Sequence, residues 1–125
     1  MTENELASVV LNLGLKVHRA LGPGLLENAY EECLYYEIQK SGLFAAKQKA
    51  LPLVYEETKL DAGYRIDLLV ENKLIVEIKA VEALNDLHLA QILTYLKLSG
   101  CKLGLLINFN TVLLKNGVRR VVNGL

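Results

Sequence analysis

The sequence has 125 residues, with 14 acidic and 14 basic side chains, so its formal net charge at neutral pH is zero. This balance argues against a strongly basic nucleic-acid clamp, whose affinity comes from neutralising phosphates, but it does not exclude a local basic patch. Hydrophobic residues make up 52% of the chain, and residues 1–125 are expected to form one domain with a substantial core.

The first forty residues predict two helices. Thr2 and Glu5 have the spacing of a capping box, and apolar residues then recur at helical spacing as far as Ala20. The Gly-Pro-Gly sequence at 22–24 interrupts this pattern, and a second helix is expected over residues 25–40. Because the interruption is short, the two helices are expected to form a corner.

The remaining elements follow a change of period. A strand is expected over residues 47–55, with Pro52 indicating an edge or a bulge. The later expected elements are two strands around a turn at 71–73, a helix over 84–99, a buried strand over 102–108, and a hairpin of 111–115 and 118–122 around Asn116-Gly117. This order predicts an α+β domain with a mixed sheet, in which the helix over 84–99 connects two parallel neighbouring strands.

The sequence YRIDLLVENKLIVEIK at 64–79 carries charged residues inside two apolar strands. A three-residue loop would pair Val70 with Leu74, which sets Asp67 across from Glu77 and Arg65 across from Lys79. Strand alternation then puts Glu77 and Lys79 on one face, and Leu74, Val76 and Ile78 on the other. On the first strand Ile66, Leu68 and Val70 are expected to share a face, opposite Asp67.

Two carboxylates directly opposite each other repel, and a divalent cation between them would resolve this conflict. Oxygen ligands of this kind suit Mg²⁺ or Mn²⁺. Lys79, beside the carboxylates, would orient or deprotonate an attacking water or neutralise negative charge, as metal-assisted phosphodiester hydrolysis requires. The alternative is a solvated face of an antiparallel sheet, where alternate charges are common.

The cysteines and the hydropathy of the chain indicate the cellular compartment in which the protein is expected. Cys33 and Cys101 match no metal-binding spacing, and both are expected to be buried, reduced thiols in a cytoplasmic protein. The polar start of the chain does not indicate a signal peptide, and no apolar run is long enough to predict a membrane span.

The pattern of Asp67 with Glu77-Ile78-Lys79 resembles the motif of the PD-(D/E)XK nuclease superfamily, with Ile66 in the place of the proline. Gly24, Glu27 and Tyr30 also read G-x-x-E-x-x-Y, and this is similar to the small GxxExxY family within that superfamily. The resemblance covers nearly the whole chain. It implies a restriction-endonuclease-like αβββαβ core, and activity as a Mg²⁺- or Mn²⁺-dependent nuclease acting on DNA.

The resemblance also suggests further site residues. Glu27 would add a metal or water contact from its helix, or, if Gly24 is the N-cap, would only cap that helix. Gln91 and Tyr95 share a helix face and resemble the Q-x-x-x-Y motif that borders the active site of RecB-like nucleases; a buried amide bonded to the backbone is the alternative for Gln91. Arg65 and Arg19 are the preferred basic residues for phosphate contacts.

The sequence therefore predicts a nuclease with Asp67, Glu77 and Glu27 as metal ligands. Lys79 would orient or deprotonate the attacking water, and Gln91 would hold the side chains around the metal site in position. Arg65, Arg19 and Tyr95 would contact the substrate. The alternative is a catalytically silent nucleic-acid- or protein-binding module that retains the nuclease fold. The apolar composition also permits a homodimer.

Overall fold

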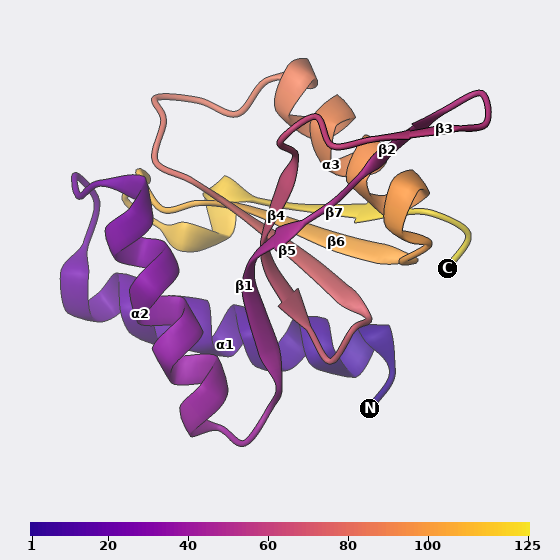
Figure 1. The fold of residues 1–125 in the computed structure, drawn as a ribbon. Coiled ribbons are helices and arrows are strands. Elements are labelled where there is room, and N and C mark those ends of the chain that lie inside the picture. Colours follow the sequence, from indigo (N-terminus) through magenta and orange to yellow (C-terminus); the bar gives the residue numbers. More distant parts are fainter.

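The structure, a computed structural model, describes residues 1–125 as an α+β fold with a five-stranded mixed sheet between helices (Figure 1). The strand order is β1-β4-β5-β6-β7, with α1 and α2 on one face and α3 on the other. None of the helices is both long and apolar enough to cross a membrane. The elements are α1 (Glu3–Leu21), α2 (Glu27–Lys40), β1 (Ala45–Ala50), β2 (Leu53–Tyr55), β3 (Thr58–Leu60), β4 (Arg65–Val70), β5 (Leu74–Lys79), α3 (Asp86–Ser99), β6 (Leu103–Asn108), the 3₁₀ helix η1 (Leu114–Gly117) and β7 (Val118–Val122).

The start of α1 is fixed by the predicted capping box. The Thr2 hydroxyl accepts a hydrogen bond from the Glu5 amide at 3.2 Å, and the Thr2 amide donates to the Glu5 carboxylate at 2.9 Å. These bonds satisfy two of the amides that every helix N-terminus leaves without an intrahelical partner. The helix then buries the apolar stripe that its sequence period predicted, including Leu6, Val10 and Val17.

The turn between β4 and β5 has the predicted length. The Lys73 amide donates to the Val70 carbonyl at 3.0 Å, and Val70 pairs with Leu74. Glu71 and Asn72 both have a positive φ, near +53°, which lets three residues reverse the chain. Beyond α3, β6 runs parallel to β5, with Leu74 opposite Leu103, so the predicted crossover is confirmed.

Two apolar cores lie on the two faces of the sheet. The larger core joins α1 and α2 to the face of the sheet that carries Leu74, Val76 and Ile78, as the alternation predicted. The smaller core packs α3 against the other face. The prediction that Ile66 shares a face with Leu68 and Val70 is wrong. Ile66 packs in the α3 core, because the alternation of β4 breaks between Ile66 and Leu68, where its ladder with β5 ends.

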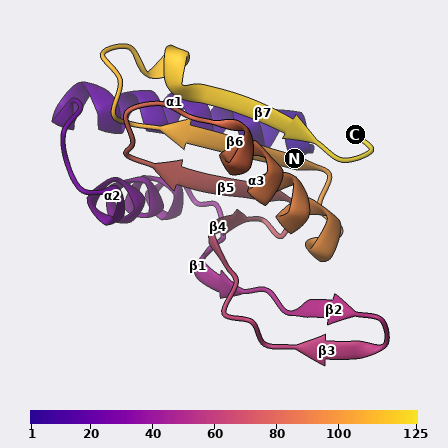
Figure 2. The same ribbon diagram turned by 90° about the horizontal axis from the view of Figure 1, so that it is seen from above.

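The strand predicted over residues 47–55 is two strands. The ladder of β1 ends at Ala50, and Pro52, which has no amide hydrogen to donate, separates it from β2. β2 pairs with β3 to form a hairpin that projects away from the main sheet (Figure 2).

The hairpin predicted around Asn116-Gly117 is absent. Residues 114–117 form η1, and β7 pairs antiparallel with β6. Gly117 is needed for close packing: a Cβ at this position would lie 2.3 Å from the Asn108 carbonyl oxygen. The Asn-Gly pair therefore serves a tight contact between segments, and not a two-residue β-turn.

Tyr30 closes the loop between the first two helices. Its ring is fully buried and stacks on Phe109 with 4.7 Å between ring centroids. Its hydroxyl accepts from the Leu25 amide at 3.0 Å and donates to the Gly22 carbonyl at 2.6 Å. The tyrosine of the G-x-x-E-x-x-Y pattern therefore belongs to the core and holds the loop in a fixed path.

Replacing Tyr30 with phenylalanine is expected to lower the free energy of unfolding by about 1–3 kcal/mol, because a buried amide and a buried carbonyl lose their partner. Urea denaturation followed by circular dichroism measures the change. Tyr36→Phe is the matched control, since Tyr36 is exposed, and it should change the stability by less than about 0.5 kcal/mol. Equal effects of the two substitutions would contradict the role given to the Tyr30 hydroxyl.

Candidate active site

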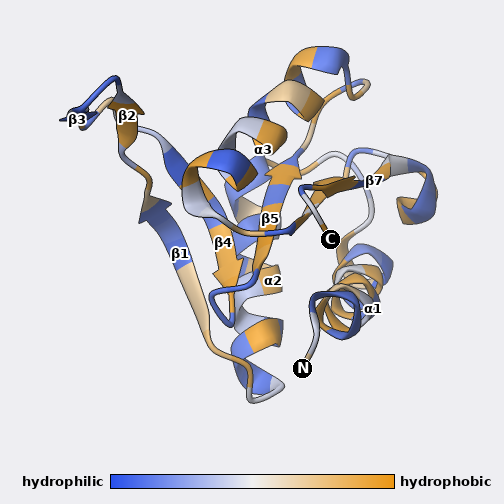
Figure 3. Cartoon of the chain, turned by 90° about the vertical axis from the view of Figure 1, so that its right-hand side faces the viewer, coloured by the Kyte–Doolittle hydropathy of each residue, from blue (hydrophilic) through white to orange (hydrophobic).

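The candidate site lies where β4 and β5 diverge. The two strands are paired from their turn as far as Leu68 and Val76, and beyond that point no ladder pair joins them. Figure 3 shows the strands side by side near the turn and apart at their far ends. Asp67 and Glu77 are the next residues on the two strands, so the sheet opens at the two carboxylates that the sequence set opposite each other.

Reciprocal hydrogen bonds join the strands at this opening. The Asp67 amide donates to Glu77 Oε2 at 2.7 Å, and the Ile78 amide donates to Asp67 Oδ2 at 2.9 Å. Each carboxylate thus accepts from a backbone amide of the opposite strand in place of a regular ladder bond. Asp67 and Glu77 are therefore neighbours as predicted, but through side chain to backbone bonds.

Glu77 is the most deeply buried acid of the site, with 3% of its surface exposed. Burial, and then the nearby Asp67 carboxylate, raise the pKa of Glu77 to about 8, against the opposing effects of the Asp67 amide and Lys79. Burial disfavours the charged form, and a like charge close by adds to that effect. A strongly raised carboxyl pKa in an opening of a sheet is typical of functional sites.

Glu31 is a site residue that the sequence analysis missed. It lies on α2 with 7% of its surface exposed, and burial followed by the Asp67 charge raises the pKa of Glu31 to about 7. Its Oε1 accepts a hydrogen bond from Gln48 Nε2 at 2.8 Å. The signal in the sequence was its position four residues after Glu27, which puts both acids on one face of the helix.

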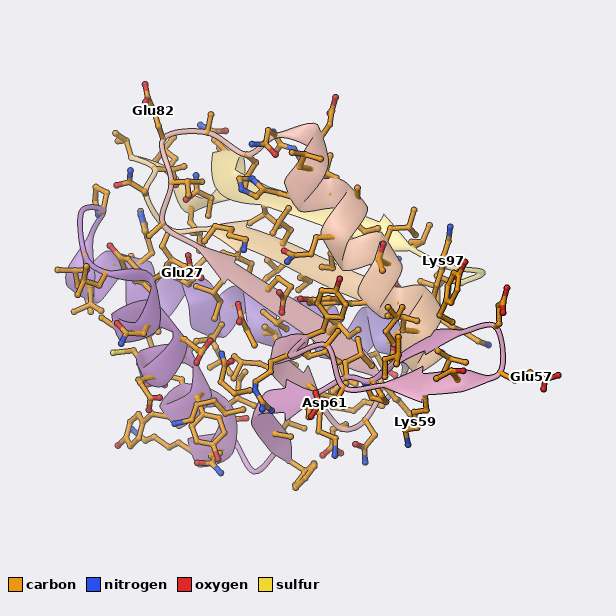
Figure 4. The ribbon with its side chains drawn as sticks, turned by 45° about the horizontal axis from the view of Figure 1, so that its top comes forward. Glu27, Glu57, Lys59, Asp61, Glu82 and Lys97 are labelled. Atoms are coloured by element: carbon orange, nitrogen blue, oxygen red, sulfur yellow. The ribbon has the colours of Figure 1, made fainter.

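Glu27 lies at the first position of α2, and Leu26 is the N-cap, so the alternative that made Gly24 the N-cap is wrong. The Glu27 side chain makes no capping bond to the helix. Figure 4 shows it at the start of α2, beside the sheet. Glu27 is an exposed residue, yet partial desolvation of its carboxyl raises the pKa of Glu27, and the positive charge of Lys79 opposes this shift.

Lys79 ends β5 on the same face as Glu77. It is half-buried, and its positive charge opposes the rise in pKa of both Glu27 and Glu77. An ammonium group among acids from a strand and a helix is the arrangement that the D…ExK pattern led us to expect. The structure thus brings Lys79, Glu77, Asp67 and Glu27 within electrostatic reach of one another.

Tyr95 approaches the same group from α3. It is buried, and burial followed by the charges of Glu77 and Asp67 raises the pKa of Tyr95. Gln91 donates from Nε2 to the Tyr95 hydroxyl at 3.3 Å, but it is exposed. The buried stripe of α3 is formed by Ile92, Tyr95 and Leu96, whereas Leu87 is 79% exposed.

The two arginines form no ion pair with the acids of the site. Arg65 is exposed at the start of β4, where it pairs with Ala50 of β1 and not with Lys79. Arg19 is exposed in the last turn of α1, next to His18, whose Nε2 lies 2.7 Å from the Thr111 carbonyl oxygen. Neither arginine forms an ion pair. His88 completes the N-terminal cap of α3 with Asn85.

The four acids of the site offer carboxylate oxygens, which are the type of ligand that a hard divalent cation prefers. Asp67, Glu77, Glu31 and Glu27 are all carboxylates, and burial and mutual repulsion raise the pKa of the last three. A cation would relieve that repulsion. No three acidic, histidine or cysteine side chains are, however, arranged to enclose a metal ion. The oxygens of Asp67 and Glu77 instead accept backbone hydrogen bonds across the opening.

This fold and this position of the acids define a restriction-endonuclease-like domain, with strands β1, β4 and β5 followed by the crossover helix α3 and the parallel strand β6. The chain belongs to the PD-(D/E)XK nuclease superfamily, whose family model matches residues 4–121. Searches of curated proteins and of solved structures find no match. Membership in this superfamily suggests nuclease activity, and its nucleases typically use divalent metals.

Proposed function

We propose that the protein is a Mg²⁺- or Mn²⁺-dependent nuclease that hydrolyses phosphodiester bonds in DNA. The observation that carries the proposal is the gathering of Asp67, Glu77 and Lys79 where β4 and β5 separate. Membership in the nuclease superfamily adds a functional reason for acids and a lysine at this point. Glu27 faces the same group from the start of α2.

In this proposal Asp67 and Glu77 hold the cation, with Glu27 assisting, and the cation when bound supplies Lewis-acid polarisation of the phosphate. Lys79 orients the attacking water and neutralises the charge that develops on the phosphate oxygens. The water oxygen forms a bond to phosphorus as the bond to the leaving oxygen breaks, and the leaving oxygen takes up a proton. Gln91 and Tyr95 order the groups at the α3 side, and Arg65 and Arg19 contact phosphates farther along the strand.

We further assign the chain to the GxxExxY branch of the superfamily on Gly24, Glu27 and Tyr30. Two free cysteines, Cys33 and Cys101, favour the cytoplasm as its compartment. A homodimer would enlarge the surface for DNA, and light scattering coupled to size-exclusion chromatography measures that state.

Replacing Asp67 with asparagine tests the proposed function. The variant is expected to lose at least about 100-fold in Mn²⁺-dependent cleavage of plasmid and single-stranded DNA, because an amide oxygen replaces a charged ligand. Glu57→Gln, in the projecting hairpin and remote from Glu27 in Figure 4, is the control and should cleave at the wild-type rate.

The second candidate is a binding module that retains the fold without catalysis. It is favoured by the backbone hydrogen bonds that the Asp67 and Glu77 carboxylates accept, since these bonds already satisfy both side chains. If the wild-type protein cleaves no DNA with either cation, and Asp67→Asn is more stable with unchanged metal binding, the nuclease proposal is wrong. DNA binding without cleavage would then identify the module.

A further inference from the structure

Gln48 has an unusual backbone conformation for a residue inside a strand. Its neighbours in β1 pair regularly with β4, Lys47 with Leu68 and Lys49 with Ile66, so Gln48 stands opposite Asp67 in the register. Its φ is +53°, in the left-handed region that residues with a side chain seldom adopt. Such a conformation persists where other interactions hold it, and it concentrates at functional sites.

The Gln48 side chain shows what holds this backbone. Its Nε2 donates to Glu31 Oε1 at 2.8 Å and to Asp67 Oδ1 at 3.2 Å. An amide nitrogen carries two hydrogens, and here both point to carboxylate oxygens. The left-handed backbone turns the side chain out of the regular alternation of β1, and the amide then meets an acid from α2 as well as one from β4.

The bridge joins three separate elements at the site. Asp67 is also bonded to the Ile78 amide of β5, and its own amide is bonded to Glu77. Gln48 therefore connects the edge strand β1 and the helix acid Glu31 to the pair that spans the opening. Without the amide, two neighbouring carboxylates from α2 and β4 would face each other with no donor between them.

We propose that Gln48 is a positioning residue: by donating to both Glu31 and Asp67 it fixes the Asp67 carboxylate, a proposed cation ligand, in place for cation binding. Its effect on cleavage rests on the proposed function, whereas the bridge itself does not. The role is assigned to the side-chain amide, and the left-handed backbone is the conformation that lets the amide reach both acids.

Two substitutions separate the amide from the backbone. Gln48→Gly removes the amide but relieves the strained φ, because glycine adopts left-handed conformations readily, while Gln48→Ala removes the amide and keeps the strain. Both variants are expected to bind Mn²⁺ about 10- to 100-fold more weakly than the wild type in calorimetry. Gln48→Gly should unfold at a higher temperature than Gln48→Ala. Gln39→Ala, an exposed glutamine on α2, is the control and should bind Mn²⁺ normally.

Cleavage by both variants should recover as the Mn²⁺ concentration is raised, since positioning acts through cation affinity. A structural defect would lower the rate at every concentration. The nuclear magnetic resonance signal of the Gln48 side-chain amide gives a readout without metal or DNA, and it should shift in Glu31→Gln and in Asp67→Asn. Wild-type Mn²⁺ affinity in Gln48→Gly, or an amide signal unchanged in both acid variants, would overturn the proposal. If the wild type neither binds Mn²⁺ nor cleaves DNA, the proposed function fails, and the amide signal still decides whether the bridge exists.

Discussion

Replacing Lys79 with alanine is expected to lower the rate constant for Mg²⁺-dependent DNA cleavage by about 10²- to 10³-fold, the loss typical when a group that stabilises developing charge is removed. Lys79 is the cation whose charge acts on both Glu27 and Glu77, and it follows Glu77 by two residues on the same face of β5. Apart from the cation, the proposed mechanism assigns no other group to neutralise charge on the reacting phosphate. Single-turnover cleavage of a labelled duplex measures the rate constant directly.

Two further substitutions make the result specific. Lys97→Ala removes an exposed lysine of α3, labelled in Figure 4, and should leave the rate unchanged. Lys79→Arg keeps the charge but cannot readily accept a proton, so an active arginine variant would assign charge stabilisation and an inactive one would indicate proton transfer. Cleavage by Lys79→Ala within a few-fold of the wild type, at unchanged melting temperature, would remove Lys79 from the mechanism.

The sequence predicted the part of the site that depends on local rules. The apolar alternation of β5, with Glu77 and Lys79 on one face, fixes which side chains enter the core. The turn after Val70 fixes the register, because a shift by one residue would place charged side chains in that core. Asp67 and Glu77 were therefore predicted to be neighbours from spacing alone.

The sequence could not predict how the sheet opens. Strand pairing rules continue a ladder to the ends of both strands, and they placed Arg65 across from Lys79. In the structure the ladder stops at Leu68 and Val76, since the Asp67 and Glu77 carboxylates take the backbone hydrogen bonds beyond that point. Gln48 and Glu31 meet Asp67 from β1 and α2 through the Gln48 amide, and no periodicity within either element indicated them together.

Local signals also failed where packing between distant segments decides the conformation. Asn116-Gly117 is a strong hairpin pair, yet Gly117 packs on the Asn108 carbonyl and β7 pairs with β6. On α3, the alternative of a buried Gln91 amide bonded to the backbone is wrong: only Tyr95 is buried, and the exposed Gln91 donates to its hydroxyl. In both places the residue pattern was compatible with two structures, and tertiary contacts selected one.

The high pKa of Glu77 predicts that the metal-free protein loses stability as the pH rises. An unfolded glutamate has a pKa of 4.5, and in the folded protein burial and then Asp67 raise the pKa of Glu77 to about 8. The folded state therefore holds this proton more tightly, so the stabilising contribution is complete below pH 4.5 and is lost as the pH rises through 8. The shift corresponds to roughly 3–5 kcal/mol.

Urea unfolding between pH 5 and 9, in the presence of a chelator, measures this effect. The free energy of unfolding of the wild type should fall across that range. Glu77→Gln should make the fall smaller, leaving the part due to Glu31, whose pKa is raised to about 7, while retaining an oxygen that can accept from the Asp67 amide. At pH 5 the two proteins should have similar stability, and at pH 9 the variant should be the more stable. Glu3→Gln, a substitution on the first turn of α1 remote from the site, should leave the wild-type slope unchanged.

Adding Mn²⁺ should reverse the fall for the wild type, because a carboxylate must be ionised to bind a cation and binding therefore stabilises the folded state more at high pH. The same addition should have little effect on Glu77→Gln, which has lost the charged ligand. A wild-type stability that rises from pH 5 to 8, or a variant with the wild-type slope, would show that Glu77 is ionised in the folded protein throughout this range. The carboxylates of Asp67 and Glu77 would then be ionised together without a cation, stabilised by Lys79 and by the backbone amides that donate to them, and their repulsion would no longer argue for a cation there.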